Sequence, residues 1–182
     1  MMAMAEPWQK AETAGPLRAM VLTRADVAVA MIKKAKRPIF VAGQDAVDVV
    51  LASGRPIDYV AQMAKAGNIP VVAAATVAKT LIGLGHQPAA LMGTVDIANR
   101  LTDKAWKGLD GEGSYDTLLV LGLPYYVGWL VLSGLKHFAP DLTTLNLDRY
   151  YQPHATWSFP NTSDEGWEEN LRVIVKGLGG KN

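Results

Sequence analysis

The chain has 182 residues, 49% of them hydrophobic, and its 18 Lys and Arg nearly balance 17 Asp and Glu. This length suits one domain with a full core, and the charge balance argues against binding to nucleic acid or to an anionic membrane. Because the sequence has no cysteine, it forms no disulfide and cannot hold an iron–sulfur cluster through thiolates.

Residues 1–22 are expected to form an N-terminal arm, followed by a single domain over 23–182. The arm is polar and lacks the charged start and apolar core of a secretory signal. No stretch of the chain approaches the roughly 20 apolar residues of a membrane span. We therefore expect a cytoplasmic protein that does not associate with membranes. Trp8, in the polar arm, hints at contact with a partner.

Helices and short apolar strands alternate along the domain. Its first half predicts a helix over 23–36, a strand over 39–42, a helix over 56–66, a strand over 69–74, helical segments over 77–84 and 95–101, and a short strand between 88 and 93. Its second half predicts a strand over 117–121, a helix over 125–138, a strand over 142–147 and a final helix after Ser163 or Asp164.

The first helix illustrates how its ends and faces are assigned. Thr23 is the expected N-cap, and Val27, Ala30 and Met31 are placed on the buried side. Four basic residues follow at 33, 34, 36 and 37. They are interpreted as cations favoured at a helix C-terminus, with a basic patch as the alternative.

Strands that are apolar throughout and separated by helices predict a three-layer α/β domain with a mainly parallel sheet. Its right-handed crossovers bring the carboxyl ends of the strands to one edge, where ligands bind in such folds. The residues expected there, as a nucleotide-binding site, are Gly43, Gln44, Thr76, Gly122 and Asp148.

These residues suit a nucleotide in outline. Gly43 and Gly122 would let the backbone approach a phosphate, Thr76 would donate a hydroxyl and Asp148 would accept ribose hydroxyls. A plainer interpretation also stands, in which the glycines serve turn geometry and Asp148 caps a loop. The turn after the first long strand has no G-x-G-x-x-G, and the chain has no P-loop.

The sequence offers no catalytic residue and no metal ligand set. It lacks a nucleophile elbow and a Ser-His-Asp constellation, and His86, His137 and His154 are not spaced as metal ligands. Asp110, Glu112 and Asp116 crowd a glycine-rich loop that fits an exposed turn better than a metal site. Aromatic residues in the C-terminal part suit flavin stacking, a protein interface or core packing: Tyr125, Tyr126, Trp129, Tyr150, Tyr151 and Trp157.

Several segments together resemble a known family, the epsilon subunit of the archaeal acetyl-CoA decarbonylase/synthase complex. The resemblance rests on K-A-K-R-P-I-F-V-A-G (34–43), A-K-A-G-N-I-P-V-V-A (64–73), L-T-D-K-A-W-K-G-L-D-G-E-G-S-Y-D-T-L-L-V-L-G (101–122), Y-Y (125–126) and A-T-W-S-F-P-N (155–161). The segments at 101–122 and 155–159 are the specific ones, and the matches cover most of the chain from Thr23 onward.

The resemblance implies a Rossmann-like domain similar to the central, FAD/NAD-binding-like domain of thiamine diphosphate enzymes. It implies a non-catalytic accessory subunit that stabilises the carbon monoxide dehydrogenase alpha subunit in a component of two alpha and two epsilon subunits, with a role in methanogenesis. Nickel and iron–sulfur clusters are then expected only in the partner subunit. The alternative that it implies is an FAD-binding module that passes electrons from those clusters to flavin.

Overall fold

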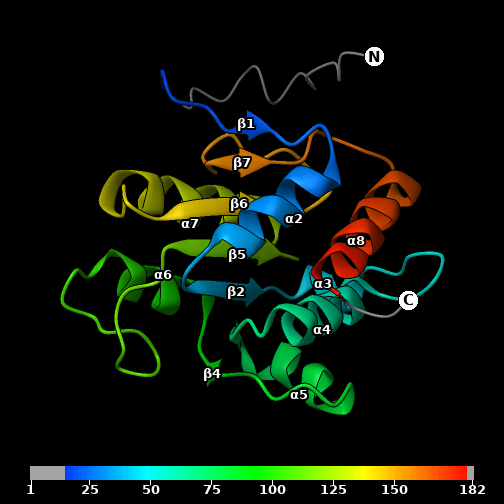
Figure 1. Ribbon diagram of the computed structural model, residues 1–182, viewed down its shortest axis with the longest axis horizontal. Coiled ribbons are helices and arrows are strands. Elements are labelled where there is room, and N and C mark those ends of the chain that lie inside the picture. The colour runs from blue at the N-terminus through cyan, green and yellow to red at the C-terminus, as the bar shows by residue number, and fades with distance from the viewer. Residues whose placement is uncertain (1–14, 180–182) are drawn as a thin grey trace.

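The computed structural model describes residues 15–179. Within them, seven strands form one parallel sheet in the order β1-β7-β6-β5-β2-β3-β4 (Figure 1). The strands are β1 (Met20–Val21), β2 (Pro38–Ala42), β3 (Val71–Ala73), β4 (Ala90–Leu91), β5 (Thr117–Leu121), β6 (Thr143–Asn146) and β7 (Trp157–Ser158). The helices are α2 (Ala25–Lys34), α3 (Asp45–Asp48), α4 (Pro56–Gly67), α5 (Ala75–Gly83), α6 (Thr94–Thr102), α7 (Tyr125–Phe138) and α8 (Asp164–Leu178).

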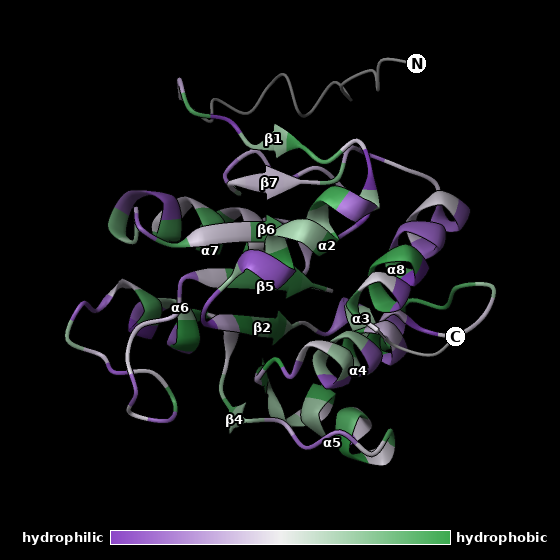
Figure 2. Ribbon diagram, viewed as in Figure 1, coloured by the Kyte–Doolittle hydropathy of each residue, from purple (hydrophilic) through white to green (hydrophobic). Residues whose placement is uncertain are grey.

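Helices cover both faces of the sheet, so the predicted three-layer α/β architecture is confirmed. On one face α8 packs between α2 and α4, and on the other α6 packs against α7 (Figure 1). Each face has its own hydrophobic core: the first core lies under α2, α4 and α8, and the second under α6 and α7. Successive strand residues point to opposite faces, so in β2 Phe40 belongs to the first core, whereas Ile39 and Val41 belong to the second. Apolar residues accordingly fill the central strands β2 and β5 (Figure 2).

The final helix follows the sequence prediction closely. The Ser163 hydroxyl caps α8 by accepting a hydrogen bond from the backbone N of Gly166 at 3.2 Å. Four apolar residues at helical spacing are buried in the core: Trp167, Leu171, Ile174 and Val175.

The predicted buried face of the first helix is wrong. The helix begins at Ala25 with Arg24 as N-cap, without a side-chain cap bond, so Thr23 does not cap it. The spacing i, i+3, i+4, i+7 then starts from Ala25 and buries Ala25, Ala28, Val29 and Ile32. Val27 and Ala30 face outward, and Met31 only borders the core.

Three short elements escaped prediction. β1 and β7 have two residues each, too few to show a pattern in the sequence, and α3 is a single turn. β1 pairs with β7 through Met20–Trp157 and Val21–Ser158. The sheet therefore begins inside the segment expected to be an arm, just before the predicted boundary at residue 22. Trp8 lies outside the described residues.

Among residues 15–179, no helix combines the length and the apolarity that crossing a membrane requires.

Candidate functional site

The residues predicted for the nucleotide site do gather at the carboxyl ends of the strands. Gly43 follows β2, Gly122 follows β5, Asp148 comes shortly after β6, and Thr76 lies in the first turn of α5. The Thr76 hydroxyl donates to Oε1 of Gln44 at 2.8 Å. The backbone N of Gly122 donates to Oδ1 of Asp148 at 2.5 Å. The contacts at this edge are thus mainly among the predicted residues themselves.

Both glycines are needed because two backbone segments pack directly against each other. A Cβ at Gly43 would overlap the carbonyl oxygen of Gly122 and lie 2.7 Å from Cα of Leu123. Gly122 has φ 78° and stands against Ala46 in α3. The backbone N of Gly43 donates to Leu121 at 2.9 Å. The space in which a phosphate could approach the backbone of these glycines is therefore filled by the protein itself.

The charge at this edge is also unfavourable for an anion. α3 is a single turn that begins at Asp45 and ends at Asp48. Burial raises the pKa of Asp45, and repulsion from Asp48 adds to the rise. Burial likewise raises the pKa of Asp148 to about 7, although the hydrogen bond from Gly122 opposes it. These carboxyl groups offer a phosphate no positive charge, and each of them would repel it when ionised.

The phosphate groups of FAD do not fit these residues. The backbone donors of Gly43 and Gly122 are already bonded within the protein, and the single helical turn that follows Gly43 carries Asp45 and Asp48. The nucleotide site at Gly43, Gln44, Thr76, Gly122 and Asp148 stays a prediction that the geometry does not favour. The arrangement agrees better with turn geometry and a capping aspartate.

The aromatic residues divide between packing and exposure. Tyr151 donates its hydroxyl to the carbonyl of Ala19 at 2.7 Å, and Trp157 borders the first core. Tyr150 lies under the guanidinium of Arg149 at 4.8 Å. Tyr126, in the first turn of α7, is 69% exposed, so both core packing and surface presentation occur.

The amino ends of the strands form the opposite edge of the sheet. There Arg37 binds the glycine-rich loop, residues 108–113. Its NH2 group donates to Oδ1 of Asp110 at 2.7 Å and to the carbonyl of Gly113 at 3.2 Å. Its guanidinium also lies 5.2 Å from the ring centre of Tyr115. The loop acids are thus engaged with a cation of the protein, and within residues 15–179 no group of three acidic, histidine or cysteine side chains is placed to hold a metal.

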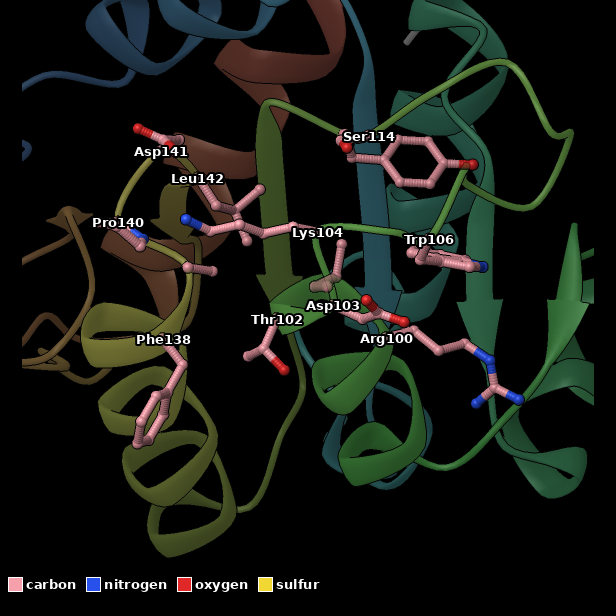
Figure 3. A pocket seen from close by; sticks show the side chains of 13 residues that line it. Arg100, Thr102, Asp103, Lys104, Trp106, Ser114, Phe138, Pro140, Asp141 and Leu142 are labelled. Atoms are coloured by element: carbon pink, nitrogen blue, oxygen red, sulfur yellow. The ribbon is translucent and has the colours of Figure 1, made fainter.

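Two hollows open at the same edge. The first, which we call the α7 hollow, has a volume of about 90 Å³ and lies between the ends of α6 and α7 and the start of the glycine-rich loop (Figure 3). The second, the β1 hollow, has a volume of about 380 Å³ and lies beside β1. Ala139, Pro140 and Leu142 line both hollows, so one segment separates them. None of the five predicted site residues lines either one.

The β1 hollow contains a histidine in an unusual environment. His154 is 5% exposed, and within the described residues neither of its ring nitrogens has a hydrogen-bond partner. Its ring meets Trp129 edge to face, with 4.8 Å between ring centres. Burial lowers the pKa of His154, and the charges of Lys136 and His137 lower it further. The environment therefore favours the neutral imidazole, and both ring nitrogens are buried within the protein.

Sequence reasoning missed these groups because their partners are remote in the chain. Arg37 was interpreted as a helix-terminal cation, whereas its partners lie more than 70 residues away. Glu168 was assigned no role, yet it is 2% exposed and accepts hydrogen bonds from the hydroxyl of Tyr59 at 2.7 Å and from the backbone N of Ser53 at 3.0 Å.

Comparison with known proteins finds several epsilon subunits of the acetyl-CoA decarbonylase/synthase complex. The chain is 37% identical to the acetyl-CoA decarbonylase/synthase complex subunit epsilon of Methanothermobacter thermautotrophicus, over 92% of this chain and 93% of the relative. It is 40% identical to subunit epsilon 1 of Archaeoglobus fulgidus, over 74% of this chain and 71% of the relative. The epsilon subunit of Methanothrix soehngenii is 35% identical over 85% of this chain and 80% of its own length.

Among solved structures, a prephenate dehydrogenase from A. aeolicus aligns over 80% of this chain and 58% of its own, with 8% identity and a TM-score of 0.41. A similarity this low supports no inference about function. A family model described as CO dehydrogenase beta subunit/acetyl-CoA synthase epsilon subunit matches residues 2–176. With that match and the high identity over most of its length, the chain belongs to the CO dehydrogenase beta subunit/acetyl-CoA synthase epsilon subunit family.

Proposed function

We propose that this chain is the epsilon subunit of an acetyl-CoA decarbonylase/synthase complex, in which it binds and stabilises the carbon monoxide dehydrogenase alpha subunit without catalysing a reaction itself. The observation that carries the proposal is the family match over residues 2–176 together with the names of the relatives. The expected assembly has two alpha and two epsilon subunits.

The composition of the chain supports a division of labour. With no cysteine in the sequence, thiolate ligation of nickel or iron must come from another chain. The carboxyl edge, where a cofactor would bind in this fold, is filled by backbone contacts and carboxyl groups. These features favour an accessory subunit over a flavin-binding module.

Native purification tests the proposal. A tag on this chain, followed by partner identification, metal analysis and an absorption spectrum, should recover a large partner that contains nickel and iron. The preparation should oxidise CO, whereas the isolated chain should not. Recovery of the chain alone under native conditions would contradict the proposal. A flavin band that follows the isolated chain would favour the electron-transfer alternative instead.

Stability of the alpha subunit gives a second readout. If this chain stabilises the alpha subunit, mass action predicts that the thermal midpoint of the alpha subunit rises with the concentration of this chain. An unchanged midpoint at saturating concentration would show that the stabilising role is absent even where binding occurs.

A further inference from the structure

The amino edge of the sheet differs in charge from the carboxyl edge because every long helix runs antiparallel to the strands. Basic residues favoured in the last helical turn therefore gather at the amino edge, and acidic residues favoured in the first turn gather at the carboxyl edge. The last-turn bases are Lys33, Lys34, Lys65, Arg100, Lys136, His137 and Lys176. The first-turn acids are Asp26, Asp45, Asp48, Asp58, Asp96, Asp164 and Glu165.

The loops at the amino edge add to the positive charge of that edge. Lys104 and Lys107 are exposed in the segment after α6, while the acids of the same loop are already engaged. Asp110 bonds to Arg37, and Asp116 accepts from the backbone N of Lys36 and of Arg37 at 2.8 and 3.2 Å. Asp103 and Asp141 also line the α7 hollow, but the two hollows together are lined by four basic side chains, Arg18, Arg100, Lys104 and Lys136, against these two acidic ones.

Large apolar side chains lie among these cations. Phe138 is 70% exposed at the end of α7 beside the α7 hollow, and Leu17 is 71% exposed beside the β1 hollow. Nζ of Lys136 donates to the carbonyl of Leu17, which ties the segment before β1 to the end of α7. Figure 3 shows Phe138 on one side of the α7 hollow and Arg100 and Trp106 on the other.

We propose that this surface, formed by the two hollows with Leu17, Arg100, Lys104 and Phe138, docks an acidic segment of the partner subunit that also presents apolar side chains. Its cations select the acidic partner, and the hollows accept side chains. The inference rests on the proposed function, because it names the surface by which that function is performed.

A second copy of this chain fits less well. Its acidic carboxyl edge would meet the basic amino edge of the first copy, which is a head-to-tail contact. Such contacts generate open chains unless the rotation closes a ring. A different partner with an acidic surface avoids this outcome.

The test measures the affinity of the full chain for the carbon monoxide dehydrogenase alpha subunit from the same source. Phe138→Ala should weaken binding at least tenfold. Tyr126→Ala is the matched control, because Tyr126 is 69% exposed at the other end of the same helix, and it should bind as the unchanged chain does. Circular dichroism and thermal unfolding should confirm that both variants are folded.

Charge is tested in parallel. Lys104→Glu should weaken binding about tenfold at low salt and much less at high salt. Lys79→Glu, at an exposed position of α5, should leave the affinity within twofold. Normal binding by both Phe138→Ala and Lys104→Glu would overturn the inference and leave the proposed function intact. Absence of binding by the unchanged chain would refute the proposed function itself. Self-association of the chain that Phe138→Ala abolishes would assign the surface to a second copy and would likewise overturn the inference.

Discussion

Gly43 lies so close to Gly122 that a side chain at Gly43 would displace the backbone of Gly122. A Cβ at Gly43 would overlap the Gly122 carbonyl, and a Cβ at Gly122 would overlap Ala46. This contact joins the end of β2 to the end of β5 at the centre of the sheet. It explains why glycine follows both strands without any need for a ligand.

Gly43→Ala should therefore destabilise the fold by about 3 kcal/mol, as overpacking does in rigid interiors. Urea unfolding monitored by tryptophan fluorescence would measure the change. Gly134→Ala is the control: a Cβ there meets nothing within 4 Å in the middle of α7, and the variant should gain about 1 kcal/mol because alanine is the better helix former. If Gly43→Ala kept full stability, the contact would be looser than described.

Asp148 should make the protein less stable as the pH rises. Its folded-state pKa is raised to about 7, chiefly by burial, from the ordinary value of 3.8. Between these values the folded state binds more protons than the unfolded state, so the free energy of unfolding falls with rising pH and levels off above about 7. Asp148→Asn keeps an acceptor for the backbone N of Gly122 and should gain about 1–3 kcal/mol at pH 8.

Denaturant unfolding from pH 5 to 8 would measure this slope in both proteins. Asp141→Asn, at an exposed position before β6, serves as the control and should keep the slope of the unchanged chain. A slope that survives in Asp148→Asn would assign the pH dependence to another group.

The sequence predicted those parts of the fold whose signals are local. Strands such as 117–121 are apolar throughout, and α8 has both a serine cap and a buried stripe of period 3.6. By contrast, β1 has two residues with no pattern of their own, and only its pairing to β7 across more than 130 residues makes it a strand. The buried face of α2 was misplaced because Val27, Ala30 and Met31 have the same helical spacing as Ala25, Ala28 and Val29, so spacing alone does not decide which face meets the core.

Prediction of the candidate site was likewise limited to what local sequence signals and sheet topology show. The topology of a parallel sheet correctly brought Gly43, Thr76, Gly122 and Asp148 to one edge. Whether that edge is open depends on the separation of two backbones, which no residue pattern encodes. Burial of Glu168 could not be foreseen either, because a glutamate in the first half of a helix is normally exposed, and here Tyr59 and Ser53 provide the partners.

Glu168 should oppose Asp148 in its effect on stability. Burial acts to raise the pKa of Glu168, but the hydrogen bonds from Tyr59 and Ser53 and the charge of Arg172 outweigh it, so the pKa is lowered from the ordinary 4.5. The stabilisation is then complete above the unfolded-state pKa and is lost as the pH falls from about 4.5 through the lower folded-state value. Glu168→Gln should cost about 1–3 kcal/mol at pH 7 and remove this part of the acid sensitivity.

Glu169→Gln is the matched control in the same helix turn. Glu169 is exposed and its carboxylate lies 3.5 Å from NH1 of Arg172, a surface ion pair of the kind that contributes about 0–1 kcal/mol. Unfolding curves at pH 3.5 and pH 7 distinguish the two variants. Equal losses in both would show that the buried network around Glu168 contributes no more than a surface pair.

Arg37→Lys should loosen the glycine-rich loop while leaving the sheet intact. The guanidinium bonds to Asp110 and Gly113 and lies over Tyr115, and a lysine ammonium cannot reproduce this flat, forked geometry. We expect amide hydrogen exchange over residues 108–113 to accelerate about tenfold or more. Arg24→Lys, in an exposed ion pair with Asp26, should leave exchange in that loop unchanged. The chain on either side of the loop borders the α7 hollow through Trp106, Ser114 and Tyr115. Arg37→Lys should therefore also weaken binding to the alpha subunit. Normal binding by a variant with faster exchange in the loop would mean that docking does not depend on an ordered loop.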